Sequence, residues 1–267
     1  MTRKEKAKMD YIIGAFIFIF GTVMASFLGV VIFRVPEGMS IVKPNSFCPS
    51  CHKEIKWYDN IPLISYIVLK GKCRYCKEKI GIESFLLELF GGLLFLGAFL
   101  SYRLSWDLLF ILPLICILIV IAGIDAHHQI IYDWSWIVFL IFSAIYVLYQ
   151  GLTLKQVPWA NFIGAGVGFV SFLLIRILSK LIAKKEALGM GDVILMGIAG
   201  LLLGWGNWLL SLMIGSLIGT IVEVTLLLLK KREKSEPVAF GPYLVTGILA
   251  GLLVGQKIIN WYLTVVM

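Results

Sequence analysis

The chain has 267 residues, of which 60% are hydrophobic and 15% are charged, and its formal net charge is +8. A soluble domain is about 45–50% apolar and about 25% charged, so this composition excludes an ordinary soluble core and indicates a polytopic membrane protein. The excess of Lys and Arg is typical of cytosolic loops between membrane spans. It does not indicate a nucleic-acid-binding protein, because no basic stripe with interleaved aromatic residues is present.

Apolar runs long enough to cross a bilayer recur along the chain. The first is followed by the one long polar stretch, residues 34–82, and then by seven further runs. The expected spans are 11–33, 83–102, 108–124, 134–150, 159–178, 192–205, 208–229 and 239–256. We therefore expect an all-α polytopic membrane protein of about eight transmembrane helices. It should have three parts: 1–33 with the first helix, a small cytosolic loop domain at 34–82, and a multi-helix membrane domain at 83–267.

The charge of the loops predicts the orientation of these spans. The stretch 34–82 carries nine Lys and Arg residues, and the alternate links 180–191 and 230–238 are also basic. On the opposite side the links carry only Arg103 and Lys155. Because Lys and Arg collect on the cytosolic side, the 34–82 loop is predicted to be cytosolic. In this orientation the third span ends, and the sixth begins, at the same cytosolic edge of the membrane.

Four of the five cysteines form two Cys-x-x-Cys pairs in the polar loop. They are Cys48, Cys51, Cys73 and Cys76. Two such pairs place four thiolates around one tetrahedral centre, which favours a structural Zn²⁺ ion without an open coordination position. Nearby basic residues such as Arg74 would stabilise the negative charge of the thiolates. Two disulfides or a vestigial site are the alternatives, although a reducing cytosol disfavours disulfides. The lone Cys116 is expected to be a small buried hydrophobic residue.

Acidic residues at the cytosolic edge are the candidate catalytic groups. Asp125 ends the third span, Asp133 follows in the next link, and Asp192 opens the sixth span after Gly189 and Gly191. Two aspartates at one site can cleave a peptide bond, because one carboxylate takes a proton from water while the other, neutral, polarises the carbonyl. The glycines would let a substrate strand approach and permit a sharp entry into the helix. The alternative is that Asp192 only caps the start of its helix.

The motifs occur in an order that resembles the type IV prepilin leader peptidases, which are membrane aspartyl proteases of the Gly-x-Gly-Asp type. The stretches that carry the resemblance are 26–36, 57–66, 71–76, 124–125, 131–133, 189–192 and 240–243. Together they cover roughly residues 20–250. The ordered set is far more specific than any one of these motifs alone.

The resemblance implies a concrete function. Members of the family remove the short basic leader from type IV prepilins and pseudopilins at the cytosolic face of the cell (inner or plasma) membrane. Those with the Cys-bearing loop also methylate the new amino group with S-adenosylmethionine. By the family pattern Asp125 and Asp192 are the catalytic pair, Gly189, Gly191 and Asp133 support them, and Glu88 helps to hold the N-terminus of the pilin.

Two readings from other functional classes remain open at this stage. One is a proton-coupled transporter, in which acids within the membrane act as proton relays. It would need acids near the middle of the bilayer and an internal repeat, neither of which is evident. The other is a zinc-containing membrane scaffold in which the aspartates merely cap helices. The sequence gives no indication of the oligomeric state.

Overall fold

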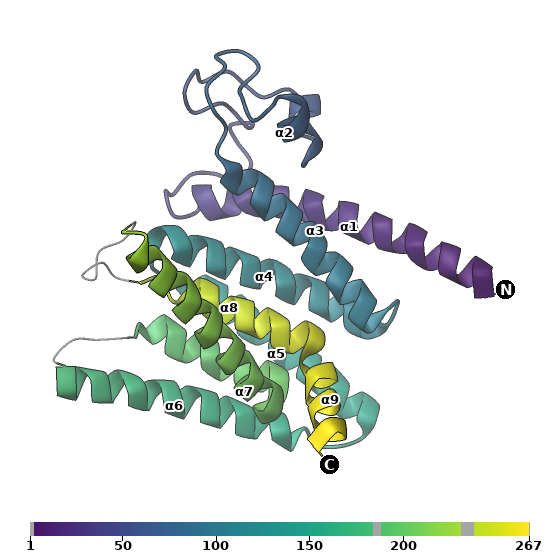
Figure 1. Cartoon of the computed structure of the whole chain (residues 1–267), viewed down its shortest axis with the longest axis vertical. Coiled ribbons are helices and arrows are strands. Elements are labelled where there is room, and N and C mark those ends of the chain that lie inside the picture. Colours follow the sequence, from purple (N-terminus) through teal and green to yellow (C-terminus); the bar gives the residue numbers. More distant parts are fainter. Residues whose placement is uncertain (1–2, 184–187, 231–237, 267) are drawn as a thin grey trace. The chain divides into compact units, whose positions relative to one another are not determined.

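The computed structural model describes residues 3–183, 188–230 and 238–266. Within these ranges the chain is helical and forms no β-strand, and seven helices are long and apolar enough to cross a membrane (Figure 1). The expected all-α architecture of a multi-pass membrane protein is therefore confirmed. Lys184, Lys185 and the basic run 231–234 lie outside the described residues.

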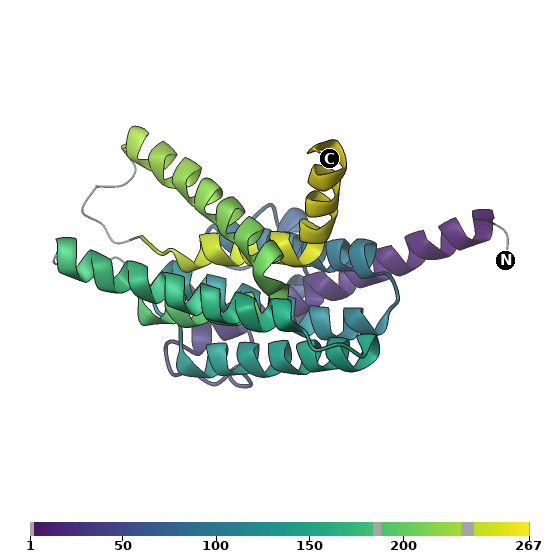
Figure 2. The ribbon, with the colours of Figure 1, turned by 90° about the horizontal axis from the view of Figure 1, so that it is seen from below.

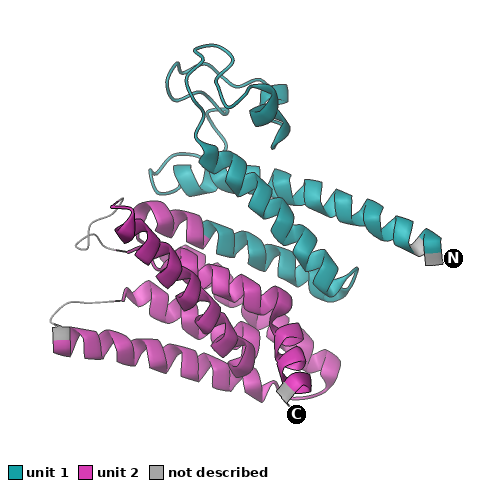
Figure 3. Ribbon diagram, viewed as in Figure 1, with its two compact units in different colours: residues 1–120 teal, residues 121–267 magenta. Residues whose placement is uncertain are grey.

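The chain divides into two compact units, residues 1–120 and 121–267 (Figure 3). The first contains α1 (Arg3–Arg34), η1 (Trp57–Asn60), α2 (Ile64–Val68), α3 (Ile82–Tyr102) and the first part of α4 (Trp106–His128). The second contains the end of α4, α5 (Asp133–Leu154), α6 (Trp159–Ala183), α7 (Met190–Leu228), α8 (Gly241–Ala250), the π-helical η2 (Gly251–Gly255) and α9 (Gln256–Val266). The polar loop lies between the end of α1 at Arg34 and the start of α3 at Ile82.

Small residues let α1 and α3 of the first unit pack closely. A Cβ atom added to Gly21 would lie 2.6 Å from the Cβ of Phe95, and one added to Gly92 would lie 2.7 Å from the Cγ2 of Thr22. Helices in lipid associate mainly through such close van der Waals packing, because the hydrophobic effect gives little drive between them. These positions join the two helices that carry the loop at 34–82.

α7 consists of two helical limbs that are joined by a sharp kink. Its 39 residues would extend about 58 Å if straight, roughly twice the apolar core of a bilayer. Gly204 interrupts it with φ 71° and ψ 161°, a conformation that favours glycine. The indole N–H of Trp208 donates to the carbonyl of Met196 at 3.1 Å, which requires the two limbs to fold back on each other. The separate spans expected at 192–205 and 208–229 are these two limbs (Figure 1).

Glycines bring α6 against the first limb of α7. A Cβ atom on Gly164 would collide with the carbonyl of Gly200 and lie 2.8 Å from the backbone nitrogen of Trp205. Asn161, on the same helix, donates from its amide nitrogen to the carbonyl of Leu201 at 2.8 Å. The break of α7 at Gly204 is therefore held by contacts from a neighbouring helix.

The second limb of α7 packs against α8 and η2. The carbonyl of Tyr243 would lie 2.7 Å from a Cβ atom on Gly215, and the Cβ of Ser211 would lie 3.0 Å from one on Gly251. After η2 the chain turns, so that α9 points away from α8 (Figure 2). The start of α8 is thereby fixed against a long helix, which matters for the site described below.

The close approach of α6 to α7 can be tested with two glycines of α6. Gly164→Ala is expected to destabilise the fold by about 1–3 kcal/mol, because the new methyl group meets backbone atoms that cannot move aside. Gly166→Ala is the matched control, since nothing lies within 4 Å of a Cβ atom there. It should leave stability unchanged or raise it by up to about 1 kcal/mol through helix propensity. Thermal unfolding of both variants in the same detergent is the measurement, and equal midpoints would contradict the packing.

Candidate active site and metal centre

The second unit contains a cavity of about 780 Å³. Its walls come from the end of α4, the middle of α6, both limbs of α7 and the segment before α8. Asp125 and Asp192 lie at it, and apolar side chains such as Phe172, Leu212 and Phe240 form much of the rest. The two acids, which are far apart in the sequence, therefore line one cavity with a largely apolar wall.

Asp125 lies in the last turn of α4 and is only 6% exposed. Its carboxylate accepts a hydrogen bond of 2.9 Å from the backbone N–H of Gly241, the first residue of α8. An added Cβ atom at position 241 would lie 2.5 Å from the Oδ2 of Asp125, so only glycine allows this approach. The bond joins residues that are 116 positions apart, and it fixes one carboxylate at the cavity wall.

Asp192 lies in the first turn of α7 and accepts a hydrogen bond of 3.3 Å from the backbone N–H of Gly189. The cap-like role considered from the sequence is thus present. The same carboxylate also lies at the cavity, close enough to Asp125 for the two to interact electrostatically. A capping role is therefore compatible with a catalytic one at this residue, because the hydrogen bond from Gly189 uses Oδ2 of the carboxylate and does not involve Oδ1.

The supporting residues differ in where they lie. Gly191 packs against Ile131, whose Cβ would be 2.9 Å from an added methyl group, so this glycine serves close packing beside the site. Gly189 has φ −68°, which any residue can adopt, so the entry into α7 does not require glycine there. Asp133 is exposed at the start of α5, outside the cavity lining, and accepts a hydrogen bond of 3.0 Å from the indole of Trp136.

A second contact holds the start of α8. The hydroxyl of Tyr243 donates to Glu223 of α7 at 2.8 Å, and the ring of Tyr243 lies over Gly219, with its Cγ 3.1 Å from the position of a Cβ atom. Tyr243 is two residues after Gly241. The contact therefore keeps the N–H of Gly241 in place beside Asp125, and it gives the acid inside the α7 span a hydrogen-bond partner.

The four paired cysteines converge in the first unit and form a four-cysteine cluster. Their sulfur atoms all lie within 4.8 Å of one another, and the Sγ atoms of Cys48 and Cys76 are 3.8 Å apart. Zn–S bonds of about 2.3 Å in a tetrahedron place sulfurs about 3.8 Å apart, so the cluster fits a zinc ion. No disulfide links them. The geometry thus favours the metal site over the disulfide alternative.

The two Cys-x-x-Cys pairs form matching turns. In the first, the N–H of Cys48 donates to the backbone carbonyl of Lys53 at 3.0 Å, and the N–H of His52 donates to the carbonyl of Cys48 at 2.8 Å. In the second, the N–H of Cys73 donates to the backbone carbonyl of Glu78 at 2.8 Å, and the N–H of Lys77 donates to the carbonyl of Cys73 at 3.1 Å. Each turn is closed by an isolated antiparallel bridge. This repeated turn points both sulfurs of a pair toward the centre.

The electrostatics of the cluster favour a bound cation. The N–H groups of Cys76 and Tyr75 lower the pKa of Cys73 to about 6. Although the N–H of Glu78 opposes it, burial and the neighbouring thiols raise the pKa of Cys76 to about 11. The sulfurs cannot all ionise side by side without a positive charge between them. A divalent metal bound at this cluster would supply that charge and keep all four as thiolates.

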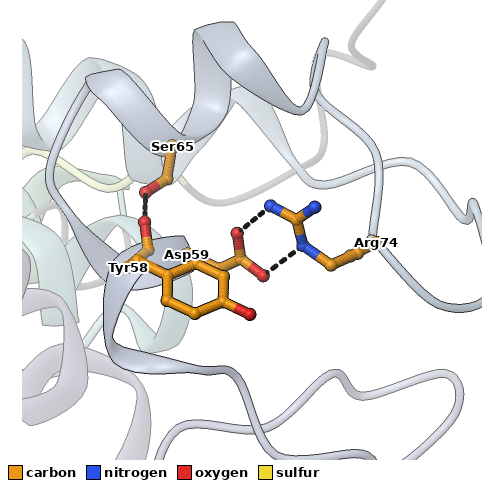
Figure 4. A network of polar contacts seen from close by, with 4 residues as sticks. All are labelled: Tyr58, Asp59, Ser65 and Arg74. Carbon is orange, nitrogen blue, oxygen red and sulfur yellow. Dashed lines mark hydrogen bonds and ion pairs between the residues drawn. The ribbon is translucent and has the colours of Figure 1, made fainter.

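Arg74 does not act as the sequence suggested. Its guanidinium forms two hydrogen bonds, of 2.7 and 2.5 Å, with the carboxylate of Asp59, which lowers the pKa of that carboxyl (Figure 4). The positive charge is thus neutralised by Asp59 rather than left for the thiolates. In the same network the hydroxyl of Ser65 donates to the carbonyl of Tyr58 at 3.1 Å. The pair ties the second Cys turn to η1, a role that residue spacing did not reveal.

Glu88 also has a contact that the sequence did not predict. Its carboxylate accepts a hydrogen bond of 2.8 Å from the backbone N–H of Leu63, just before α2. The acid inside the α3 span therefore anchors the polar loop to that helix. The other residues missed from the sequence are the cavity walls from α6 and the second limb of α7, such as Ser171, Phe172 and Leu212. Nothing in their local sequence distinguishes them from ordinary span residues.

Comparison with known proteins matches both halves of the chain. Residues 19–102 match the bacterial peptidase A24 N-terminal domain, and residues 112–224 match the type IV leader peptidase family. Relatives named prepilin leader peptidase/N-methyltransferase are similar over most of the chain. The one from Pseudomonas aeruginosa is 34% identical over 269 residues, 91% of each chain, and the one from Aeromonas salmonicida is 31% identical over 277 residues, 94% of each. A relative from Myxococcus xanthus is 35% identical over 222 residues, 81% of this chain and 64% of its own.

The chain belongs to the prepilin leader peptidase/N-methyltransferase family. No solved structure matches it. The two family models divide the features described above between them, because the first includes the four cysteines and Glu88, and the second includes Asp125 and Asp192. The resemblance seen in the motifs is thereby confirmed.

The metal site can be tested by cysteine replacement. Cys76→Ser is expected to lose bound zinc, since three thiolates and a hydroxyl form a much weaker tetrahedral site. Cys116→Ser is the matched control, because Cys116 lies in α4, outside the cluster. We expect one zinc per chain in the parent and in the control, measured by elemental analysis of the purified protein. Equal zinc in both variants would contradict the site.

Proposed function

We propose that this chain is an aspartyl endopeptidase that removes the leader peptide of type IV prepilins and pseudopilins. The observation that carries the proposal is the shared cavity of Asp125 and Asp192, each held by a backbone N–H. Two carboxyls at one site titrate as a pair, so that one can be ionised and take a proton from water while the other donates to the carbonyl. The family to which the chain belongs supplies the substrate class.

We further propose that the reaction occurs at the cytosolic face of the cell membrane. Both aspartates lie within a few residues of a helix end, and the loops at that side are the basic ones. Water can then reach the acids without crossing the hydrocarbon core. The same position argues against a proton-coupled transporter, whose relay acids would lie near the middle of the bilayer.

The apolar wall of the cavity agrees with such a substrate. A prepilin has a short basic leader followed by an apolar stem, so its scissile bond lies where polar and apolar segments meet. Phe172, Leu212 and Phe240 can receive apolar side chains after the bond, while the acids face the bond itself. The zinc ion, held by the four-cysteine cluster, would be structural, because four protein ligands leave no open position for substrate.

We also propose that the chain methylates the new N-terminal amino group with S-adenosylmethionine, as the names of its relatives suggest for those proteins. A crevice of about 300 Å³ lies beside the four-cysteine cluster and is lined by Tyr75, Glu78 and Ser84 among others. An aromatic ring and a carboxylate suit a ligand that carries an aromatic base and a positive sulfonium. The donor would supply the methyl group, and this crevice is the candidate place for it.

The peptidase proposal is tested with carboxamide variants in phosphatidylethanolamine–phosphatidylglycerol proteoliposomes and a purified prepilin. Asp125→Asn and Asp192→Asn are each expected to lower the cleavage rate at least about a hundredfold, because each removes one partner of the acid–base pair. Asp107→Asn, at the opposite end of the helix that carries Asp125, is the matched control and should cleave normally. Cleavage that survives in either active-site variant would exclude the aspartyl mechanism.

Mass spectrometry of the product, with and without S-adenosylmethionine, tests the methylation.

Gly241 provides a sharper test of the geometry. Gly241→Ala is expected to lower kcat by about a hundredfold with little change in KM, because the new methyl group displaces the carboxylate of Asp125 from its N–H donor. Gly206→Ala is the control, since an added Cβ atom there would approach only Ile259, at 3.8 Å. Steady-state cleavage of the prepilin by both variants is the measurement. A normal kcat in Gly241→Ala would show that this contact does not position the acid.

A further inference from the structure

α2 and the segment before it carry an apolar face that the described residues of the chain leave uncovered. Ile64, Ile67 and Val68 are 58%, 64% and 66% exposed, and Trp57 of η1 is 79% exposed. Positions 64, 67 and 68 lie on one side of a helical turn. The opposite side faces inward, because the ring of Tyr66 packs on Phe85 of α3 with a centroid distance of 5.0 Å. The segment is thus two-sided, with an anchored face and an outer apolar face.

The depth of this segment follows from its contacts with α3. Phe85 and Glu88 are three and six residues after the start of α3, so they lie about 5 and 9 Å along the helix from Ile82. Glu88 binds the N–H of Leu63 at 2.8 Å. α3 is one of the helices long and apolar enough to cross the membrane. The contacts therefore hold α2 beside the first turns of a span rather than beyond its end.

We infer that η1 and α2 insert their apolar face into the headgroup–acyl boundary of the lipid leaflet on the side of the 34–82 loop. An apolar helical face at this depth meets lipid, and burying it there is favourable. Trp57 is of the type that collects at membrane interfaces, and Lys56 and Lys70 bracket the segment with charges that attract anionic headgroups. The contact of Glu88 with Leu63 then has a clear consequence, since it keeps the four-cysteine cluster close to the membrane surface.

This interaction would be independent of the peptidase chemistry. It gives the loop two fixed points, the ion pair of Asp59 with Arg74 within the loop and the lipid contact outside it. A loop with few buried residues of its own gains rigidity from both. Lipid is the partner that fits best, because the face lies beside the first turns of a membrane helix and the one acid between positions 57 and 68, Asp59, is already paired with Arg74.

Photo-crosslinking in the full-length protein tests the inference. Benzoylphenylalanine replaces Ile64 or Ile67 in proteoliposomes of phosphatidylethanolamine and phosphatidylglycerol, and adducts are identified by mass spectrometry. Phe16, 69% exposed in the α1 span, is the positive control, and the exposed Glu78 in the second Cys turn is the negative control. Lipid adducts at 64 and 67, at a yield near that of position 16 and absent at 78, are expected.

Two other outcomes would overturn it. Crosslinks from 64 and 67 to another part of the same chain, or to prepilin added to the vesicles, would identify a protein partner for this face instead of lipid. A yield of lipid adducts no higher than at position 78 would show that the face stays in water. Zinc content is measured for every variant, so that a loop that fails to fold is recognised and replaced by a label at Val68.

Discussion

An acid placed in or beside a membrane helix needs a donor, and this requirement organises the structure. Each of four such acids accepts a hydrogen bond from a distant or loop-borne group. Asp125 receives the N–H of Gly241, Asp192 that of Gly189, and Glu88 that of Leu63, while Glu223 receives the hydroxyl of Tyr243. Three of the four donors are backbone groups at or just before the start of a helix, where N–H groups lack partners within the helix. The acids and the helix starts therefore satisfy one another.

Glycine allows the closest of these approaches, because it has no side chain. A side chain at 241 would occupy the space of the Asp125 carboxylate, and one at 191 would displace Ile131. At Gly204, and likewise at Gly38 and Gly71 of the polar loop, glycine serves instead through its backbone freedom, since φ there is 71°, 67° and 66°. The two glycines of the Gly-x-Gly-Asp motif thus have structural roles that differ from those predicted from the sequence. The second, Gly191, serves close packing, and the first, Gly189, has an ordinary extended conformation.

Much of this organisation could be predicted from the sequence. Each successful prediction depended either on a local sequence pattern or on the alternation of basic and non-basic loops along the chain. Apolar length gave the helices, cysteine spacing gave the cluster, and loop charge placed Asp125 and Asp192 at one depth. Contacts between distant segments could not be predicted in this way. The donor to Asp125 is 116 residues away, the partner of Arg74 is a single acid among several, and the walls from α6 look like any apolar span. The first helix also begins at residue 3 rather than 11, since the polar N-terminal residues continue the helix.

For the proposed aspartyl peptidase, the position of the aspartates at helix ends would reconcile hydrolysis with a lipid environment. The proposed reaction needs water and two carboxyls, whereas the apolar stem of the proposed substrate needs a dry surface. A cavity with acids at the ends of α4 and α7 and apolar residues such as Phe172 along its wall meets both needs. Because the N–H donors that hold the acids lie at or just before helix starts, the polar groups of the site stay together at the cavity. The spans beneath it remain free to be as apolar as the bilayer demands.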